Sequence, residues 1–345
     1  NTSISFSPPS PHEEILENGT KLIVVERNDL PLTSFGMVIR TGSAQDLFER
    51  PGLTKFTTDM LVEGTSKRNS MEISDEIEFL GAQIQKDVAR EYLVLSVDGL
   101  SSHLEQEVEI LADVFNNPTF PRKEFDRIKK ERLSELRAST DSADFVADIA
   151  YQSILYGSDS SYGHPSIGTV PSISGISLPE IEYHYNKYLL SAPQTFIAVG
   201  KTSLSQLKNL VETYFPKQNN EPGSLAINEP YNPKAPEKTT IYLVDRPGSA
   251  QSVIRAGHLT IPRSHQDYLS FSFLNYILGG DYSGRLNLNL RQDKGYSYGF
   301  YSGISWNTIS SPWQARGSVQ TEVTGNSIRE VVNEIRGLKS NNPVS

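Results

Sequence analysis

The chain has 345 residues, of which 37% are hydrophobic and 21% charged, as in a globular protein of two or three domains. Its formal net charge of -9 argues against a nucleic-acid partner, and the absence of cysteine excludes disulfides and thiolate metal sites. No segment reaches the roughly eighteen consecutive apolar residues expected of a membrane-spanning helix.

The cellular compartment is only loosely constrained. The first residue, Asn1, is not Met and no apolar signal segment follows it, so a removed export signal and a trimmed chain are both open. Zero cysteine is compatible with an oxidising compartment without requiring one. Export to a bacterial periplasm is favoured over the cytoplasm or a mitochondrion.

The first two thirds of the chain predict an α+β domain, an antiparallel sheet covered by helices. After an extended Pro-rich leader over 1–12, apolar runs and alternation predict strands at 21–26, 33–40, 91–98 and 194–199. Apolar residues at helical spacing, with capping and stop signals, predict helices at 52–65, 70–80, 102–115, 123–138, 141–155, 178–189 and 203–215.

Residues 217–237, rich in Asn, Pro, Gly and Glu, predict a linker, and beyond it the chain repeats itself. Segment 240–246 echoes the strand at 21–27, 269–280 corresponds to 53–64, and 327–338 corresponds to 102–115. We therefore predict two homologous α+β domains, 1–216 and 238–345. The second repeat stops soon after Asn341-Asn342-Pro343, so we expect this domain to be truncated, with the natural C-terminus beyond Ser345.

The helix predicted at 52–65 carries three polar residues on one face. Lys55, Thr58 and Asp59 are spaced by three and four positions, which brings them together on a helix. The run Gly-Leu-Thr-Lys-Phe-Thr-Thr-Asp-Met-Leu-Val-Glu-Gly-Thr resembles the zinc-binding helix of the pitrilysin/insulinase family of inverted-motif peptidases. That family has Gly-Leu-x-His-x-x-Glu-His-Met-Leu-x-x-Gly-Thr here. The resemblance covers 15–343 and implies two or more homologous α+β domains.

The frame of the motif is retained, but both histidines and the glutamate are replaced. Catalytic zinc sites normally have three His, Cys or carboxylate ligands, and an ammonium at Lys55 repels the ion. Thr58 cannot replace a carboxylate as general base. Lys55 and Asp59 are expected to form an exposed ion pair worth about 0.3–0.5 kcal/mol. Glu135 lies near the position of the family's third ligand and is interpreted as a solvated carboxylate, so we expect no metal or other cofactor in this chain.

A second family pattern lies in the second domain. Leu278-Gly-Gly-Asp-Tyr-Ser-Gly-Arg-Leu286 is followed by Arg291 and, seven residues later, Tyr298. It resembles the pattern in which such an Arg and Tyr face the zinc across the cavity between domains. The resemblance implies that Arg291 holds the substrate backbone and that Tyr298 donates a hydrogen bond to the carbonyl oxygen as charge develops there. Without the resemblance, the two residues would be interpreted as a salt-bridged Arg and a half-buried strand Tyr.

Three functions follow from these residues. The leading hypothesis is a zinc-less subunit of a heteromeric metallopeptidase: a homologous partner supplies the zinc-bearing helix, and this chain lends Arg291 and Tyr298 for peptide hydrolysis. The alternative is a non-catalytic scaffold or assembly subunit, like the family's respiratory-complex core proteins. An autonomous peptidase would need a replacement metal site, for which Asp59 and Glu135 are too few ligands. The retained Arg and Tyr favour the first hypothesis, because a scaffold has no chemical need for them.

Overall fold

The computed structural model describes residues 8–216 and 238–340, which divide into two compact units. The first unit comprises 8–136 and 165–216, and the second comprises 137–164 and 238–340. This grouping differs from the predicted domain bounds, which placed 137–164 in the first domain. The predicted linker at 217–237 lies outside the described residues.

The first unit is built on a six-stranded sheet with the strand order β1-β2-β6-β3-β5-β4. Its strands are β1 (His12–Ile15), β2 (Lys21–Glu26), β3 (Leu32–Ile39), β4 (Gln83–Val88), β5 (Leu93–Leu100) and β6 (Gln194–Gly200). All neighbouring strands are antiparallel except β2 and β6. The sheet predicted to be antiparallel therefore contains one parallel pair, because β6 inserts between β2 and β3. The sequence analysis also missed β1 and β4.

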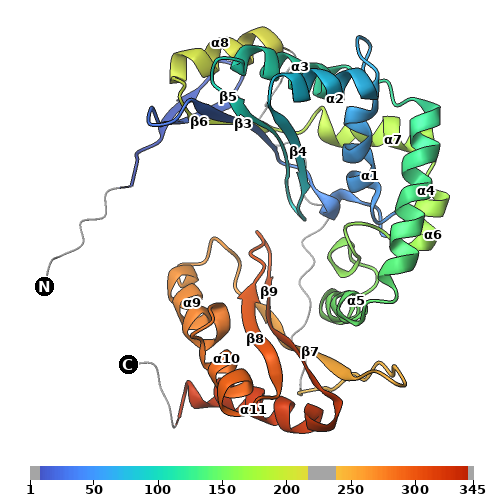
Figure 1. Cartoon of the computed structure of the whole chain (residues 1–345), viewed down its shortest axis with the longest axis vertical. Coiled ribbons are helices and arrows are strands. Elements are labelled where there is room, and N and C mark those ends of the chain that lie inside the picture. Colours follow the sequence, from blue (N-terminus) through green and yellow to red (C-terminus); the bar gives the residue numbers. More distant parts are fainter. Residues whose placement is uncertain (1–7, 217–237, 341–345) are drawn as a thin grey trace, which may run out of the picture. The chain divides into compact units, whose positions relative to one another are not determined.

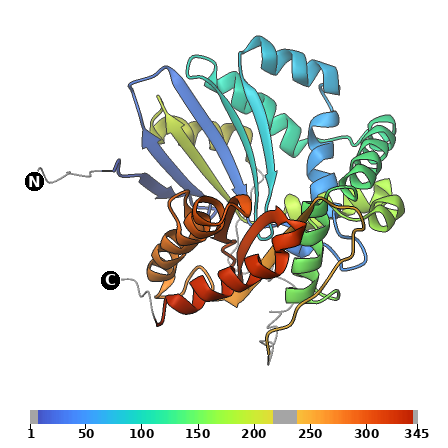
Figure 2. The same ribbon diagram turned by 60° about the horizontal axis from the view of Figure 1, so that its bottom comes forward.

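Alternating apolar residues give the sheet one face that is covered by helices. On β3, Phe35, Met37 and Ile39 are fully buried. Helices α2 (Ser70–Phe79), α3 (Leu104–Asn116) and α8 (Leu204–Tyr214) cover this face (Figures 1 and 2). The Phe35 ring packs against Phe196 and Phe215 at centroid distances of 6.0 and 6.2 Å. This aromatic cluster joins the sheet to its helical cover.

Further helices flank the β4 side of the first unit (Figure 1). They are α1 (Leu53–Met60), α4 (Arg122–Ser139), α6 (Val170–Gly175) and α7 (Leu178–His184). Short 3-10 turns lie at Ser43–Gln45 and Leu61–Glu63, and a π-helical turn, Tyr185–Leu189, continues α7. None of the helices in the described part of the chain combines the length and apolar character needed to cross a bilayer.

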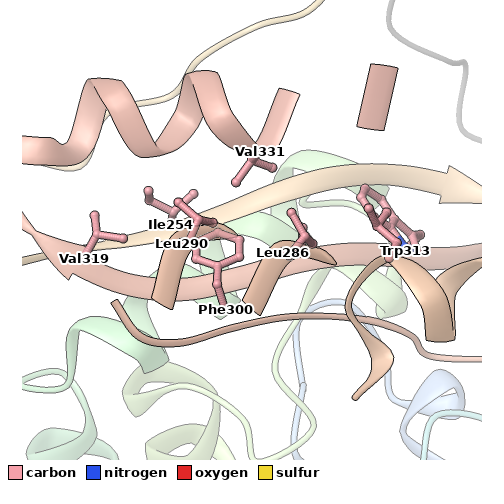
Figure 3. Packing of buried hydrophobic residues seen from close by; sticks show 9 residues of the cluster. Ile254, Leu286, Leu290, Phe300, Trp313, Val319 and Val331 are labelled. Atoms are coloured by element: carbon pink, nitrogen blue, oxygen red, sulfur yellow. The ribbon is translucent and has the colours of Figure 1, made fainter. Parts of the chain in front are cut away.

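The second unit is built on a three-stranded antiparallel sheet. Its strands are β7 (Gln251–Thr260), β9 (Ser311–Gln320) and β8 (Ser297–Ile304), in that order. Its helical segments are α9 (Tyr268–Asn275), α10 (Arg285–Asn287), α11 (Thr324–Gly337), the 3-10 turns Ser161–Gly163 and Thr321–Val323, and the π-helical turns Tyr276–Gly280 and Leu288–Asp293. The core gathers Leu286, Leu290, Phe300, Val319 and Val331 between the sheet and these helices (Figure 3).

Helix α5 (Ala143–Tyr156) also belongs to the second unit and packs against β7. The Arg255 guanidinium contacts the Asp148 carboxylate at 2.6 Å and the Asp144 carboxylate at 2.8 Å. The Tyr151 hydroxyl donates a hydrogen bond to the Trp313 carbonyl at 2.6 Å, and burial raises the pKa of this phenol. These contacts explain why the segment after α4 groups with the second sheet.

Segment 240–246, predicted to match the strand at 21–27, is not a strand. It has no regular structure, and Ile241 and Leu243 are 74% and 89% exposed. Strand propensity alone does not form a ladder: no described strand pairs with this segment, so its backbone groups have no strand partner.

The two sheets nonetheless share their central arrangement. In the first, the order β3-β5-β4 has helix α1 between β3 and β4 in sequence. In the second, the order β7-β9-β8 has α9 between β7 and β8. The α+β class with two related domains is thereby confirmed.

Candidate functional site

Helix α1 begins on a buried polar cap. The Asp46 carboxylate accepts hydrogen bonds from the backbone N–H groups of Gly52 and Thr54, each at 2.8 Å, and from the Thr54 hydroxyl at 2.7 Å. Gly52 has φ 92°, and a Cβ there would lie 2.7 Å from the Gly168 Cα, so only glycine fits. The retained first residue of the motif thus sets the start of the helix.

The same cap holds a histidine that the sequence analysis did not single out. His184 Nε2 lies 2.9 Å from the Thr54 hydroxyl, and the residue is only 1% exposed. Desolvation lowers the pKa of His184 to about 3 and raises that of Asp46 to about 7. The network is therefore a buried structural cap, and nothing in it presents a reactive group to solvent.

The retained apolar frame fixes the inner side of α1. Phe56 and Met60 are fully buried, and Leu53 is nearly so. The Phe56 ring stacks on Phe125 of α4 with centroids 5.3 Å apart. Burial of side chains of this size contributes about 1.5–3 kcal/mol each. The frame is thus explained by packing, whatever the polar face does.

The polar face departs from the prediction in one residue. Thr58 does not share an exposed face with Lys55 and Asp59: it is fully buried, and its hydroxyl donates to the Thr54 carbonyl at 2.8 Å. The correction follows from the surrounding helices, which cover more of α1 than its apolar spacing alone indicates. Thr58 therefore acts as a buried side chain bonded to its own helix.

Lys55 and Asp59 do meet, but their ion pair is not the exposed one that was expected. The Lys55 Nζ lies 2.7 Å from Asp59 Oδ1, and the two side chains are only 25% and 13% exposed. The other carboxylate oxygen, Asp59 Oδ2, accepts a hydrogen bond from Arg132 of α4. Arg132 also contacts Glu135 at 2.9 Å. Both Asp59 oxygens are thus engaged, and Glu135, which is 56% exposed, pairs with the arginine.

Two cations of this cluster were missed by the sequence analysis. Arg132 was signalled by its i,i+3 spacing to Glu135, a pattern typical of a helical ion pair. Lys86 carried no signal, because β4 itself was not predicted. Its Nζ lies 3.5 Å from the Asp59 backbone carbonyl, and desolvation lowers its pKa.

These residues do not fit a zinc ion. Zinc requires three or four His, Cys or carboxylate donors, whereas here the Lys55 ammonium and the Arg132 guanidinium surround a single carboxylate. Within 8–216 and 238–340, no group of three or more His, Asp or Glu side chains is suitable for holding a metal. The polar face of the helix that has the family's frame is therefore occupied by an ion-paired cluster, with Lys55 from α1 itself and Arg132 from α4.

The second predicted pair lies in the second unit, on neighbouring segments. Arg291 lies on the π-helical turn Leu288–Asp293, and its guanidinium stacks over the Tyr282 ring at 4.7 Å. No carboxylate of the described residues lies within ion-pair distance of Arg291, which contradicts the salt-bridged alternative. Gly279, where a Cβ would meet the Ser302 nitrogen at 2.7 Å, lets this helical region pack closely on β8.

Tyr298 is placed by an irregularity in β8, which is an edge strand. The pairing of β8 with β9 shifts between Ser297 and Phe300. The Ser297 hydroxyl spans this shift, accepting from the Gly299 N–H at 3.0 Å and lying 2.8 Å from the Ser318 carbonyl. Phe300 is fully buried, whereas Tyr298 is 88% exposed and not half-buried. A bulge of this kind re-aims a side chain, here the Tyr298 phenol, towards solvent.

The structure thus brings Lys55 and Asp59 into contact, and places Arg291 and Tyr298 in one unit without a hydrogen bond or ring contact between them among the described residues. The charged groups of Lys55 and Asp59 both contact other side chains. The phenol hydroxyl of Tyr298 and the guanidinium N–H groups of Arg291 have no described hydrogen-bond acceptor. Such groups are available to a peptide or to another chain.

Two family models match the chain. Residues 22–158 match the insulinase family, peptidase family M16, and residues 175–345 match the peptidase M16 inactive domain. The chain superposes on a crystal structure of a peptidase M16 inactive domain from Pseudomonas fluorescens with a TM-score of 0.89 and 26% identity, covering 97% of this chain and 80% of that one.

Curated relatives carry names of both catalytic and non-catalytic proteins. An uncharacterized zinc protease, YmxG of Bacillus subtilis, is 24% identical over 83% of this chain and 68% of its own length. The non-peptidase homolog YmxG of Helicobacter pylori is 22% identical over 91% of this chain and 71% of its own. The human mitochondrial-processing peptidase subunit beta is 25% identical over 62% of this chain. The chain spans 43% of that subunit and 63% of a similar zinc protease from Streptomyces coelicolor.

Proposed function

The chain belongs to the insulinase (M16) peptidase family, and because its zinc-ligand positions hold the ion-paired Lys55 and Asp59, with Thr58 in place of the general base, we propose that it is the zinc-less subunit of a two-chain peptidase. In this proposal a homologous partner carries the zinc-bearing helix. This chain lends Arg291 and Tyr298 to the partner's site. Peptide bonds are the substrate.

The observation that carries the proposal is the contrast between a lost ligand set and a retained Arg and Tyr whose hydrogen-bonding groups have no acceptor among the described residues. The Tyr298 side chain is 88% exposed on an edge strand. A phenol aimed at the oxygen of a carbonyl under attack stabilises the transition state more than the substrate. The Arg291 guanidinium has parallel N–H donors that suit the backbone carbonyls of an extended peptide.

The partner is proposed on chemical grounds. Neither Thr58 nor the paired Asp59 can generate a nucleophilic water, so the attacking group has to come from another chain. A similar protein, the mitochondrial-processing peptidase subunit beta, is by its name one subunit of an assembly. A homologous subunit with the intact His-x-x-Glu-His helix would supply what this chain lacks.

Reconstitution tests the proposal. Peptide cleavage is measured for this chain alone, for the candidate zinc subunit alone, and for an equimolar mixture, each with and without a chelator. We expect cleavage only in the mixture, and its loss on chelation. Cleavage by this chain alone at the rate of the mixture contradicts the proposal.

The alternative, a non-catalytic scaffold, has one observation in its favour: one bacterial relative is called a non-peptidase homolog. A mixture that forms a stable complex but cleaves no faster than the zinc subunit alone would establish the scaffold.

A further inference from the structure

Lys86 is a half-buried ammonium that has no carboxylate of its own. It lies on β4, and its single described hydrogen bond runs to the Asp59 backbone carbonyl at 3.5 Å. Among the described residues no carboxylate lies within 4.0 Å of its Nζ. Desolvating an ammonium is costly unless it is paired.

The nearest carboxylates are already engaged by other cations. Asp59 gives one oxygen to Lys55 at 2.7 Å and the other to Arg132. Glu63, which also attracts the Lys86 charge, pairs with Arg127. Lys55 and Arg132 repel the Lys86 ammonium and lower its pKa further, after the larger effect of desolvation. The fold therefore gathers three cations around one carboxylate and supplies no counter-ion for the third.

A carboxylate from outside the chain is the group that this arrangement lacks. Charge-assisted hydrogen bonds between an ammonium and a carboxylate are about twice as strong as neutral ones. The Lys86 residue is partly exposed. Its strand, β4, is the last strand of the six-stranded sheet, and the outer edge has no partner strand among the described residues. Extended peptides add to edges of this kind through their backbone.

We propose that Lys86, with Lys55 and Arg132 around it, forms a carboxylate-binding site that selects peptides carrying an acidic group. The inference rests on the proposed function, since it assumes that this chain meets peptides. The shared chemistry is a carboxylate, either an acidic side chain or a peptide C-terminus. One of the three cations, Lys55, stands at a position that holds the metal ion in zinc-bearing members.

Calorimetric titration of the full chain tests this site with three short peptides of Ala, Ser and Thr. The first has one central Glu and an amidated C-terminus, the second has Gln in its place, and the third has Gln and a free C-terminal carboxylate. We expect the Glu peptide or the free-carboxylate peptide to bind about tenfold more tightly than the amidated Gln peptide. Which of the two does so identifies the source of the carboxylate.

Three variants assign the preference to Lys86. Lys86→Met should abolish it, Lys86→Arg should retain it, and Lys123→Met, an exposed lysine on α4, should leave it unchanged. Circular dichroism checks that each variant is folded. If Lys86→Met is not folded, the three wild-type titrations and Lys86→Arg still decide the matter.

The proposal is overturned if wild type binds all three peptides equally or not at all, or if folded Lys86→Met keeps the preference. These titrations measure peptide binding to the isolated chain, without a partner subunit. Their failure leaves the cleavage test of the two-chain peptidase unaffected, and failure of that cleavage test leaves the peptide preference measurable.

Discussion

The two regions that match the family's motifs differ in what their polar groups contact. On α1, Asp59 is held by Lys55 and Arg132, and Thr58 bonds to its own helix. In the second unit, Arg291 rests on an aromatic ring and Tyr298 is 88% exposed. The first region uses its polar residues for internal hydrogen bonds and ion pairs, whereas the Arg291 guanidinium and the Tyr298 hydroxyl of the second have no hydrogen-bond acceptor among the described residues.

This difference predicts which replacements change stability and which change binding. A side chain whose partners are all internal affects stability when it is replaced, whereas an exposed side chain without partners adds little to stability and is available for binding. Variants on α1 should therefore change unfolding, and variants at Arg291 or Tyr298 should change turnover of the pair.

The largest expected effect is that of Arg291→Ala on peptide cleavage by the reconstituted pair. Loss of a guanidinium that positions the substrate should lower kcat/KM on the order of 10²–10³-fold, with unfolding little changed. The measurement is steady-state kinetics beside a denaturation curve. The matched control is Arg329→Ala, which replaces an exposed arginine on α11 whose one described side-chain hydrogen bond is to Asn326, and it should be neutral. Equal rates for both variants would remove Arg291 from the site.

Asp59→Ala should change the free energy of unfolding, which Arg291→Ala leaves nearly unaltered. It leaves Lys55 and Arg132 without the carboxylate that both contact, and it removes an attractive charge near Lys86, so we expect the free energy of unfolding to fall by about 2–3 kcal/mol. This is less than for a fully buried pair, because part of the cluster meets solvent. Urea unfolding measures the change. Glu135→Ala, which removes only the more exposed carboxylate, should cost much less, and a stable Asp59→Ala protein would show that the cluster is dispensable.

Acidification should affect the polar cap of α1 in two opposite ways. The pKa of Asp46 is raised to about 7. The stability linked to its protonated form is therefore fully present below the usual pKa of 3.8 and is lost as pH rises towards 7. The pKa of His184 is lowered to about 3, so the stability linked to its neutral form is present above 6.5 and is lost as pH falls towards 3. Between these limits the two slopes oppose each other.

Single variants separate the two slopes. Relative to wild type, Asp46→Asn should lose stability on acidification from pH 6.5 to 4, and His184→Gln should gain it. Each slope is at most about 1.4 kcal/mol per pH unit. Urea unfolding at a series of pH values measures it. Parallel curves for wild type and both variants would mean that neither group titrates with folding.

The smallest expected effect is that of Lys55→Met. It removes one i,i+4 ion pair but also relieves repulsion between Lys55 and Lys86, so unfolding should change by less than about 0.5 kcal/mol. A thermal or urea curve displaced by much more would mean that Lys55 is needed to hold Asp59 in place.

The sequence predicted what local spacing determines. The α1 frame, the Lys55–Asp59 contact and most helices follow from residue intervals, and the α+β class follows from their order. It did not predict that Thr58 would be buried or that Arg132 would reach Asp59, because both depend on the elements that pack around α1. It missed Lys86 because β4 reads QIQKDV, which lacks a strong strand signal.

The strand expected at 240–246 shows that local propensity can also predict an element that does not form. Its apolar residues have strand propensity, but a strand needs a partner, which no local pattern supplies. Likewise, the exposure of Tyr298 depends on a register shift against β9 that no interval in the sequence reveals.

Tyr298→Phe in the reconstituted pair tests the central claim most directly, because the substitution removes one hydroxyl from an 88% exposed ring. Tyr301→Phe, 36% exposed on the same strand, is the matched control. We predict that kcat falls on the order of 10²–10³-fold for Tyr298→Phe, with assembly and unfolding unchanged, and that Tyr301→Phe is neutral. A correctly assembled Tyr298→Phe pair that cleaves peptides at the wild-type rate would contradict the account.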